Sequence, residues 1–102
     1  DVAVDIRKSS PTFGQHVSIE LTAQNKHQLF VPHGFAHGFV VLSDSATFAY
    51  KVDNYYAPEH DRGIAFDDKE LKINWQLSAE ELQLSDKDKT HPTLENTKDL
   101  FE

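Results

Sequence analysis

The sequence predicts an all-β fold in which short strands form an antiparallel sandwich or a jelly-roll barrel. Apolar and polar residues alternate through much of the first two-thirds of the chain, as they do in strands with one buried face. Turn-forming residues interrupt this alternation about every eight to twelve positions. Segments with helical spacing are few and lie near the end of the chain. We therefore expect about five to seven strands and little helix.

The first strand shows the alternation most clearly. In residues 1–7, Val2, Val4 and Ile6 fall on one face, whereas the charged residues fall on the other. Loops rich in Ser, Pro, Gly, Asn and Asp separate the later strands. These later strands are expected at residues 16–22, 28–31, 36–42 and 46–53, with shorter candidates at 63–66 and 71–75.

The pattern changes at residue 78. The run Ser78-Ala79-Glu80-Glu81 fits a capping box, Ser85 is a weaker N-cap candidate, and residues 92–101 have the spacing of a marginal short helix. We therefore divide the chain into residues 1–77, strands of a jelly-roll barrel, and residues 78–102, a tail with short helical segments that packs on the barrel.

Composition excludes several kinds of site. The chain has 102 residues and a net charge of −7, which fits a single domain and argues against nucleic acid or an anionic membrane surface as a partner. The absence of Cys excludes disulfides, thiolate zinc sites and Cys nucleophiles. No stretch approaches the roughly 20 apolar residues of a membrane span. Without a leader or Cys, the cytoplasm is the expected location.

The start of the chain suggests a longer parent protein. The sequence contains no Met, and the first strand is already in mid-alternation at residue 1. We therefore expect this sequence to be a piece of a larger polypeptide.

The densest cluster of functional candidates surrounds His37. Pro32 ends one strand, Gly34 permits a sharp reversal, and His37 lies on the next strand with Phe39 and Val41 on its face. A lone His is weak evidence of function, and a hydrogen-bonded interior His is slightly the better interpretation from the residues alone. The spacing Pro32-x-Gly34-x-x-His37 resembles the second cupin motif, but no His-x-His pair accompanies it. One His cannot hold a metal, so no metal is expected.

Tyrosines supply the other candidates. Tyr50 shares a face with Phe48 and Val52, which favours a core residue with a satisfied hydroxyl. On the inner wall of a barrel, however, a phenol can donate a proton to a carbanion, since it is protonated at neutral pH. The loop at 54–62 carries Tyr55 and Tyr56, which either stack on a nucleobase or shield the end of the barrel.

Several of these motifs together resemble the dTDP-4-dehydrorhamnose 3,5-epimerases. The similar segments are residues 1–14, 32–39, 50–51 and 54–58, followed by Leu84-Ser85-Asp86-Lys87-Asp88 and Pro92 in the tail. They occur in family order over nearly the whole chain and correspond to about the C-terminal half of that family. The resemblance implies a cupin-type jelly roll whose early strands are missing here, with residues 1–77 as its C-terminal strands. It also implies a homodimer without a cofactor that acts on a dTDP-linked 4-keto-6-deoxy sugar.

The resemblance also assigns roles. The reaction removes protons next to the C4 ketone, at C3 and C5, and returns them from the opposite face. Tyr50 matches the family's proton donor, and Asp88 matches the carboxylate that orients the catalytic His base. Four residues match substrate-binding positions: His37, Tyr56 (stacking on the thymine), Asp61 and Lys87.

Some of the family's catalytic groups have no match in this chain. The base His, the Lys that stabilises the enolate and the Arg contacts to the diphosphate precede the segment that matches residue 1. We therefore expect an isomerase whose 102-residue piece is inactive alone and ordered only as a paired or strand-swapped oligomer. The alternatives are a 3- or 5-epimerase, a 3,4-ketoisomerase on related sugars, and a non-catalytic cupin that binds sugar nucleotides.

Overall fold

Three short strands and one turn of 3-10 helix are the regular elements of the computed structural model, which describes residues 1–55, 57, 61–77, 81–97 and 100–101. The strands are β1 (Val2–Asp5), β2 (His16–Ser18) and β3 (Phe35–Gly38), and the 3-10 helix is η3 (Lys87–Lys89). The rest of the described chain is turns and irregular segments, so the expectation of strands with little helix holds at this coarse level.

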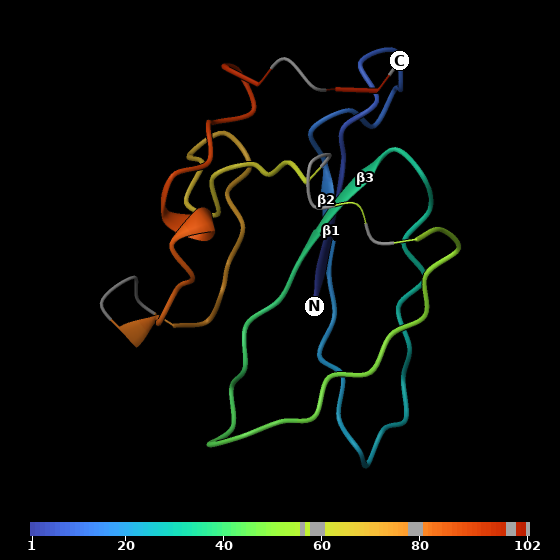
Figure 1. Ribbon diagram of the computed structural model, residues 1–102, viewed down its shortest axis with the longest axis vertical. Helices are drawn as coiled ribbons and strands as arrows, with labels where there is room; N and C mark the ends of the chain where they lie inside the picture. Colours follow the sequence, from blue (N-terminus) through green and yellow to red (C-terminus); the bar gives the residue numbers. More distant parts are fainter. Residues whose placement is uncertain (56, 58–60, 78–80, 98–99, 102) are drawn as a thin grey trace.

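The strands form one antiparallel sheet in the order β2-β1-β3, with β1 in the centre (Figure 1). Ala3 of β1 pairs with Val17 of β2 on one side and with His37 of β3 on the other. Residues directly opposite each other in antiparallel strands point to the same face. The sheet therefore has a core face, which carries Val2, Val4 and Ala36, and a His37 face, which carries Asp1, Ala3, Asp5, Phe35 and His37.

Fewer strands form than the alternation predicts. The expected strand at 16–22 shortens to β2, and the one at 36–42 shortens to β3, beginning at Phe35. The expected strands at 28–31, 46–53, 63–66 and 71–75 are irregular in the structure, so these predictions are wrong. Alternation reports which side chains are apolar, whereas a strand also needs a neighbour that completes its ladder of backbone hydrogen bonds.

The hydrophobic core lies against the core face. Val2 and Val4 are 4% and 5% exposed, and they pack with Ile6, Leu71 and Leu94. Burying one such side chain contributes roughly 1.5–3 kcal/mol. Partly buried apolar residues surround this cluster, namely Ala36, Ile64, Ile73, Trp75 and Leu100. The later part of the chain thus covers one face of the sheet.

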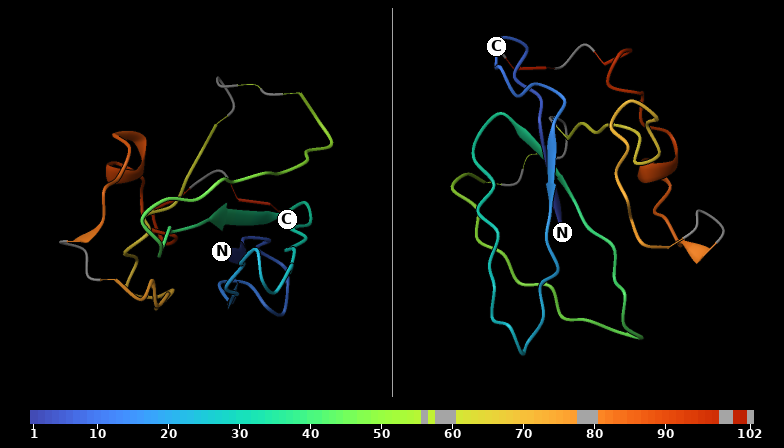
Figure 2. Two further views of the ribbon diagram at one scale, coloured as in Figure 1. Left: turned by 90° about the horizontal axis from the view of Figure 1, so that it is seen from below. Right: turned by 180° about the vertical axis from the view of Figure 1, so that it is seen from behind.

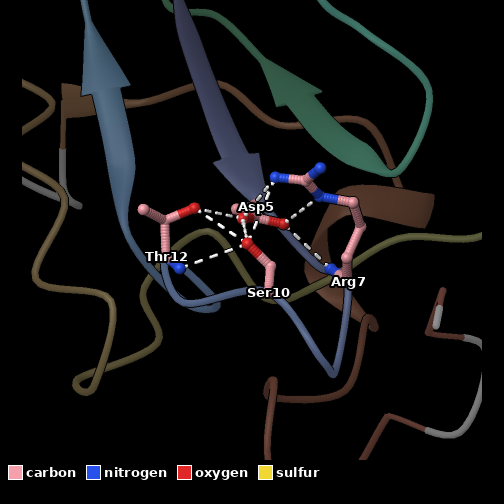
Figure 3. Close-up of polar contacts among 4 residues, drawn as sticks. All are labelled: Asp5, Arg7, Ser10 and Thr12. Atoms are coloured by element: carbon pink, nitrogen blue, oxygen red, sulfur yellow. Dashed lines mark hydrogen bonds and ion pairs between the residues drawn. The ribbon is translucent and has the colours of Figure 1, made fainter.

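A buried carboxylate stabilises the His37 face of the sheet, opposite the core face. Asp5 is 1% exposed and receives two parallel hydrogen bonds from the Arg7 guanidinium, both at 2.9 Å (Figure 3). The Ser10 hydroxyl donates to the same carboxylate at 2.6 Å, and so does the Thr12 hydroxyl. The Arg7 hydrogen bonds, with smaller contributions from the two hydroxyls, hold the pKa of Asp5 far below its ordinary value. The charged carboxylate therefore ties β1 to the turn that follows it.

Gly34 lets Arg7 reach this position. The φ angle of Gly34 is +87°, which side-chain-bearing residues rarely adopt, and a Cβ there would lie 2.6 Å from Cγ of Arg7. The carbonyl of Gly34 accepts a hydrogen bond from the Ile6 amide at 3.0 Å. The Arg7 guanidinium lies 5.0 Å from the centre of the Phe35 ring, a cation–π distance. Gly34, just before β3, and Arg7, two residues after β1, therefore fit closely together.

The C-terminal segment lies beside the sheet, and its end lies against the chain that follows β1 (Figures 1 and 2). Backbone hydrogen bonds join Phe101 to Ile6 and Lys8 at 3.1 and 2.6 Å. At the start of η3, the Ser85 hydroxyl accepts a hydrogen bond from the Asp88 amide at 3.3 Å. The capping box at Ser78 falls mostly on positions outside the described residues.

The predicted helix at 92–101 is wrong for the described positions. Residues 94–96 form a turn, with bonds from the Asn96 amide to the Thr93 carbonyl and from the Thr97 amide to the Leu94 carbonyl. A short helix is costly to nucleate, and Leu94 here is fixed in the core instead. No helix among the described residues is long and apolar enough to cross a membrane.

Candidate functional site

A row of four aromatic rings joins two segments that are separate in the sequence. Phe39 and Phe48 stack with centroids 4.2 Å apart and planes 10° apart. His37 lies 6.1 Å from Phe48, and Tyr50 lies 5.3 Å from Phe48 on a tilted plane. We call His37, Phe39, Phe48 and Tyr50 the aromatic row. It brings together His37 and Tyr50, which the sequence singled out separately.

The aromatic row is open to solvent. Tyr50 is 72% exposed, so its interpretation as a core residue is wrong. Phe39 and Phe48 are also exposed, and both line a hollow of about 240 Å³ whose wall includes Asp1 and Trp75. Exposed aromatic side chains beside a hollow are typical of binding surfaces rather than of packing.

His37 has a carboxylate partner. Its Nε2 atom is hydrogen-bonded to Oδ1 of Asp1, whose side chain is only 9% exposed. Burial lowers the pKa of His37. A lowered pKa favours the neutral imidazole. The interpretation of His37 as a hydrogen-bonded histidine is correct, yet the residue also lies at the end of the aromatic row.

A second group of predicted site residues lies around η3. The Lys87 ammonium donates to the Asp61 carboxylate at 2.5 Å, across 26 residues of sequence. This contact, more than the charges of His91 and Arg62, lowers the pKa of Asp61. Two residues that were assigned separately to substrate binding thus form one ion pair.

Asp88 lies one residue further along η3 and faces an imidazole. Its Oδ1 atom is 3.4 Å from Nε2 of His91. The His91 ring packs on the backbone of Gly63, where a Cβ would lie 2.4 Å from the ring. The His91 ring is thus fixed between Gly63 and the Asp88 carboxylate, which is more than half exposed.

The structure therefore sorts the predicted residues into two groups. His37 and Tyr50 belong to the aromatic row, whereas Asp61, Lys87 and Asp88 surround η3. The segment around residues 46–55 and η3 lie on different sides of the molecule (Figures 1 and 2). Tyr56 lies outside the described residues. Among the described positions, no three His, Asp or Glu side chains form a metal-binding cluster.

Sequence reasoning missed two partners of these residues. From the alternation, Asp1 is placed only on the charged face of the first strand, and no role is assigned to His91. The register shows what could have identified Asp1: it lies two residues before Ala3, which pairs with His37, on the same face of the sheet. For His91, the spacing of three residues from Asp88 was the available signal.

Comparisons with known proteins agree on one family. The family model for dTDP-4-dehydrorhamnose 3,5-epimerase matches residues 1–96. The epimerase of Pseudomonas aeruginosa is 57% identical over 89 residues, which cover 87% of this chain and 49% of that protein. The epimerase of Methanothermobacter thermautotrophicus is 44% identical over 98 residues, covering 94% and 53%. The chain thus spans about half the length of the curated relatives it matches.

Solved structures show the same similarity in space. A crystal structure of dTDP-6-deoxy-D-glucose-3,5-epimerase from Legionella pneumophila, in complex with dTDP-4-keto-L-rhamnose, superimposes with a TM-score of 0.91 at 50% identity. It covers 95% of this chain and 51% of that one. The epimerase of Elizabethkingia anophelis gives a TM-score of 0.89 at 47% identity, covering 93% and 52%. Family model, sequence identity and backbone therefore lead to one conclusion: this chain belongs to the dTDP-4-dehydrorhamnose 3,5-epimerase family.

Proposed function

We propose that this chain forms part of the active site of a nucleotide-sugar epimerase, which converts dTDP-4-dehydro-6-deoxy-D-glucose to dTDP-4-dehydro-L-rhamnose. The family supports the reaction, and the ligand named for the Legionella pneumophila structure is the corresponding keto sugar. The observation that carries the proposal is the aromatic row, because it holds an exposed phenol and a partnered imidazole on one surface.

Tyr50 is the proton donor in this proposal. At each of C3 and C5, a base removes the proton and the electron pair moves onto the C4 oxygen as an enolate. Tyr50 returns a proton to the opposite face of the same carbon, so each centre is inverted. Its tilted ring contact with Phe48 supports this role, since it limits the ring's orientation while the hydroxyl stays accessible.

The remaining residues bind or orient. His37 contacts the sugar, Tyr56 stacks on the thymine, and Asp61 and Lys87 contact the substrate as a pair. Asp88 orients the catalytic His, which the family resemblance assigns to a segment that this chain does not match. The enzyme is a homodimer, and no cofactor is required, because the ketone itself acidifies the neighbouring C–H bonds.

The test is solvent-deuterium incorporation at C3 and C5 of the keto sugar in D₂O. We expect no incorporation by the 102-residue chain alone, because the acid lacks its base. We expect incorporation when the chain is joined to the half of the Pseudomonas aeruginosa epimerase that it does not match. This joined protein is called the complemented enzyme below.

The outcomes separate the alternatives. Rapid deuterium incorporation by the 102-residue chain alone would contradict the proposal that this chain supplies the acid but not the base. A complemented enzyme that binds the sugar nucleotide but exchanges no deuterium would support a non-catalytic binding module instead. Exchange at one carbon only would indicate a 3- or 5-epimerase, since the reach of the Tyr50 hydroxyl decides which carbon receives a proton.

A further inference from the structure

We propose that Asp1 is a positioning residue that holds His37 as the Nε2–H tautomer, so that Nδ1 accepts a hydrogen bond from a sugar hydroxyl. The inference rests on the proposed function for the identity of the ligand, but not for the state of the imidazole. In a neutral imidazole one nitrogen carries the proton and the other keeps a lone pair. The hydrogen-bonding partner of one nitrogen decides which of the two is protonated.

The contact between Asp1 and His37 determines which group donates the hydrogen bond. Oδ1 of Asp1 faces Nε2 of His37 within hydrogen-bond distance, and a carboxylate can only accept. The proton of neutral His37 therefore resides on Nε2, and Nδ1 keeps its lone pair. His37 then acts toward a ligand as an acceptor, which suits a hydroxyl and not a carbonyl or a phosphate.

Both residues are held in place. The Asp1 nitrogen donates to the Ile19 carbonyl at 2.9 Å, and the Asp1 carbonyl accepts from the Ile19 amide at 2.9 Å. His37 is fixed by its backbone pairing with Ala3 and by ring contacts to Phe39 and Phe48. Two anchored partners lose little conformational freedom when they form the bond, so one tautomer persists.

The chain contains a matched pair for comparison. His33 and Asp53 form the same kind of contact, Nε2 to Oδ2 at 2.7 Å, but their side chains are 82% and 78% exposed. The Asp53 carboxylate raises the pKa of His33, whereas burial lowers that of His37. The exposed pair is therefore the control for a histidine–aspartate contact without burial.

The test is nitrogen NMR of the imidazoles in the 102-residue chain, with Asp1→Ala and Asp53→Ala. In the unaltered chain we expect one tautomer at His37 and a directly observed Nε2 proton that exchanges slowly. Asp1→Ala should abolish that proton signal and leave a mixture of tautomers, while Asp53→Ala leaves His37 unchanged. A His37 protonated on Nδ1 in the unaltered chain, or a spectrum unaffected by Asp1→Ala, would overturn the proposal.

A second measurement uses the complemented enzyme. We expect Asp1→Ala to lower kcat/KM by about 10- to 100-fold, the range found when a metal-ligating histidine loses its hydrogen-bonding partner. The double variant with His37→Ala should be no worse than His37→Ala alone, because Asp1 acts through His37. Additive losses would contradict the proposal. If the complemented enzyme is inactive, the proposed function fails, whereas the NMR result still decides the state of His37.

Discussion

The two faces of β1 differ in what covers them. The core face is closed by this chain's own later residues, with Leu71 and Leu94 packed on Val2 and Val4. The His37 face holds two nearly buried carboxylates, Asp5 and Asp1, each satisfied by a partner. One face therefore stabilises the sheet by apolar burial, while the other combines a structural ion pair with residues of the candidate site. Substitutions should separate these roles.

The largest expected effect is on catalysis. Tyr50→Phe keeps the ring on Phe48 and removes only the hydroxyl, so we expect the complemented enzyme to lose about 10²- to 10⁴-fold in activity. Its free energy of unfolding should stay within about 0.5 kcal/mol, because the residue is exposed. Deuterium incorporation and urea denaturation measure the two quantities. Tyr55→Phe, at a 96% exposed position, is the control, and equal losses in both variants would contradict the role of Tyr50.

The core face predicts the largest loss of stability. Leu94→Ala removes a 7% exposed side chain from the cluster, which should cost about 2–5 kcal/mol of unfolding free energy. Leu42→Ala, at a position 44% exposed, should change it by no more than about 0.5 kcal/mol. Chemical denaturation of both variants tests the contrast. Similar losses would show that the core does not lie where we place it.

A substitution at Gly34 tests how closely the turn before β3 fits the Arg7 side chain. Gly34→Ala forces an alanine into a left-handed conformation, at about 1–2 kcal/mol, and adds a clash with Arg7. Gly14→Ala is the matched control, since Gly14 has a φ of +82° but its Cβ would meet Leu94 at an ordinary 3.6 Å. Thermal unfolding should therefore show a greater loss for Gly34→Ala. Equal losses of stability in the two variants would mean that the Arg7 side chain moves aside at little cost in free energy.

Asp5 gives the His37 face a pH dependence. Its folded pKa lies below the value of about 3.9 expected in an unfolded chain, so its contribution is fully present above about pH 4 and declines as the pH falls further. Asp5→Asn should therefore lose stability at pH 7 and show a flatter decline between about pH 5 and 2. Urea denaturation across this range measures the slope, with Asp44→Asn as an exposed control. An unchanged slope in Asp5→Asn would contradict the ion pair.

The smallest expected effect concerns the pair beside η3. Lys87→Gln should change the unfolding free energy by no more than about 0.5 kcal/mol, because exposed ion pairs are screened by water and salt. It should also raise the pKa of Asp61 toward its ordinary value. Carboxyl NMR titration measures that shift. An unmoved Asp61 would show that the contact is absent in solution.

The sequence predicted the family and the first strand, and both were found. Alternation in residues 1–7 placed Val2 and Val4 in the core, as found. The resemblance to the family singled out His37 and Tyr50, which the structure brings into one row of rings. The same reasoning erred where partners decide the outcome, since residues 46–53 alternate but no described strand pairs with them.

Buried charge was the least predictable feature. Asp5 and Asp1 appear in the sequence as the polar side of a half-exposed strand, yet both side chains are nearly buried. Their burial depends on Arg7, Ser10 and His37, which contact them only after the chain has folded. The hydrophobic pattern predicts which face of a strand a residue occupies, but not which groups contact that residue in the folded chain.

The central claim is that the aromatic row contacts the sugar of the nucleotide sugar. The most direct measurement is an NMR titration of the complemented enzyme with dTDP-L-rhamnose, with isotope label only in the 102 residues of this chain. The account predicts that the largest chemical-shift changes occur at His37, Phe39, Phe48 and Tyr50, while Val4 and Leu94 on the core face stay unchanged. Saturable binding that leaves the aromatic row unperturbed would contradict it.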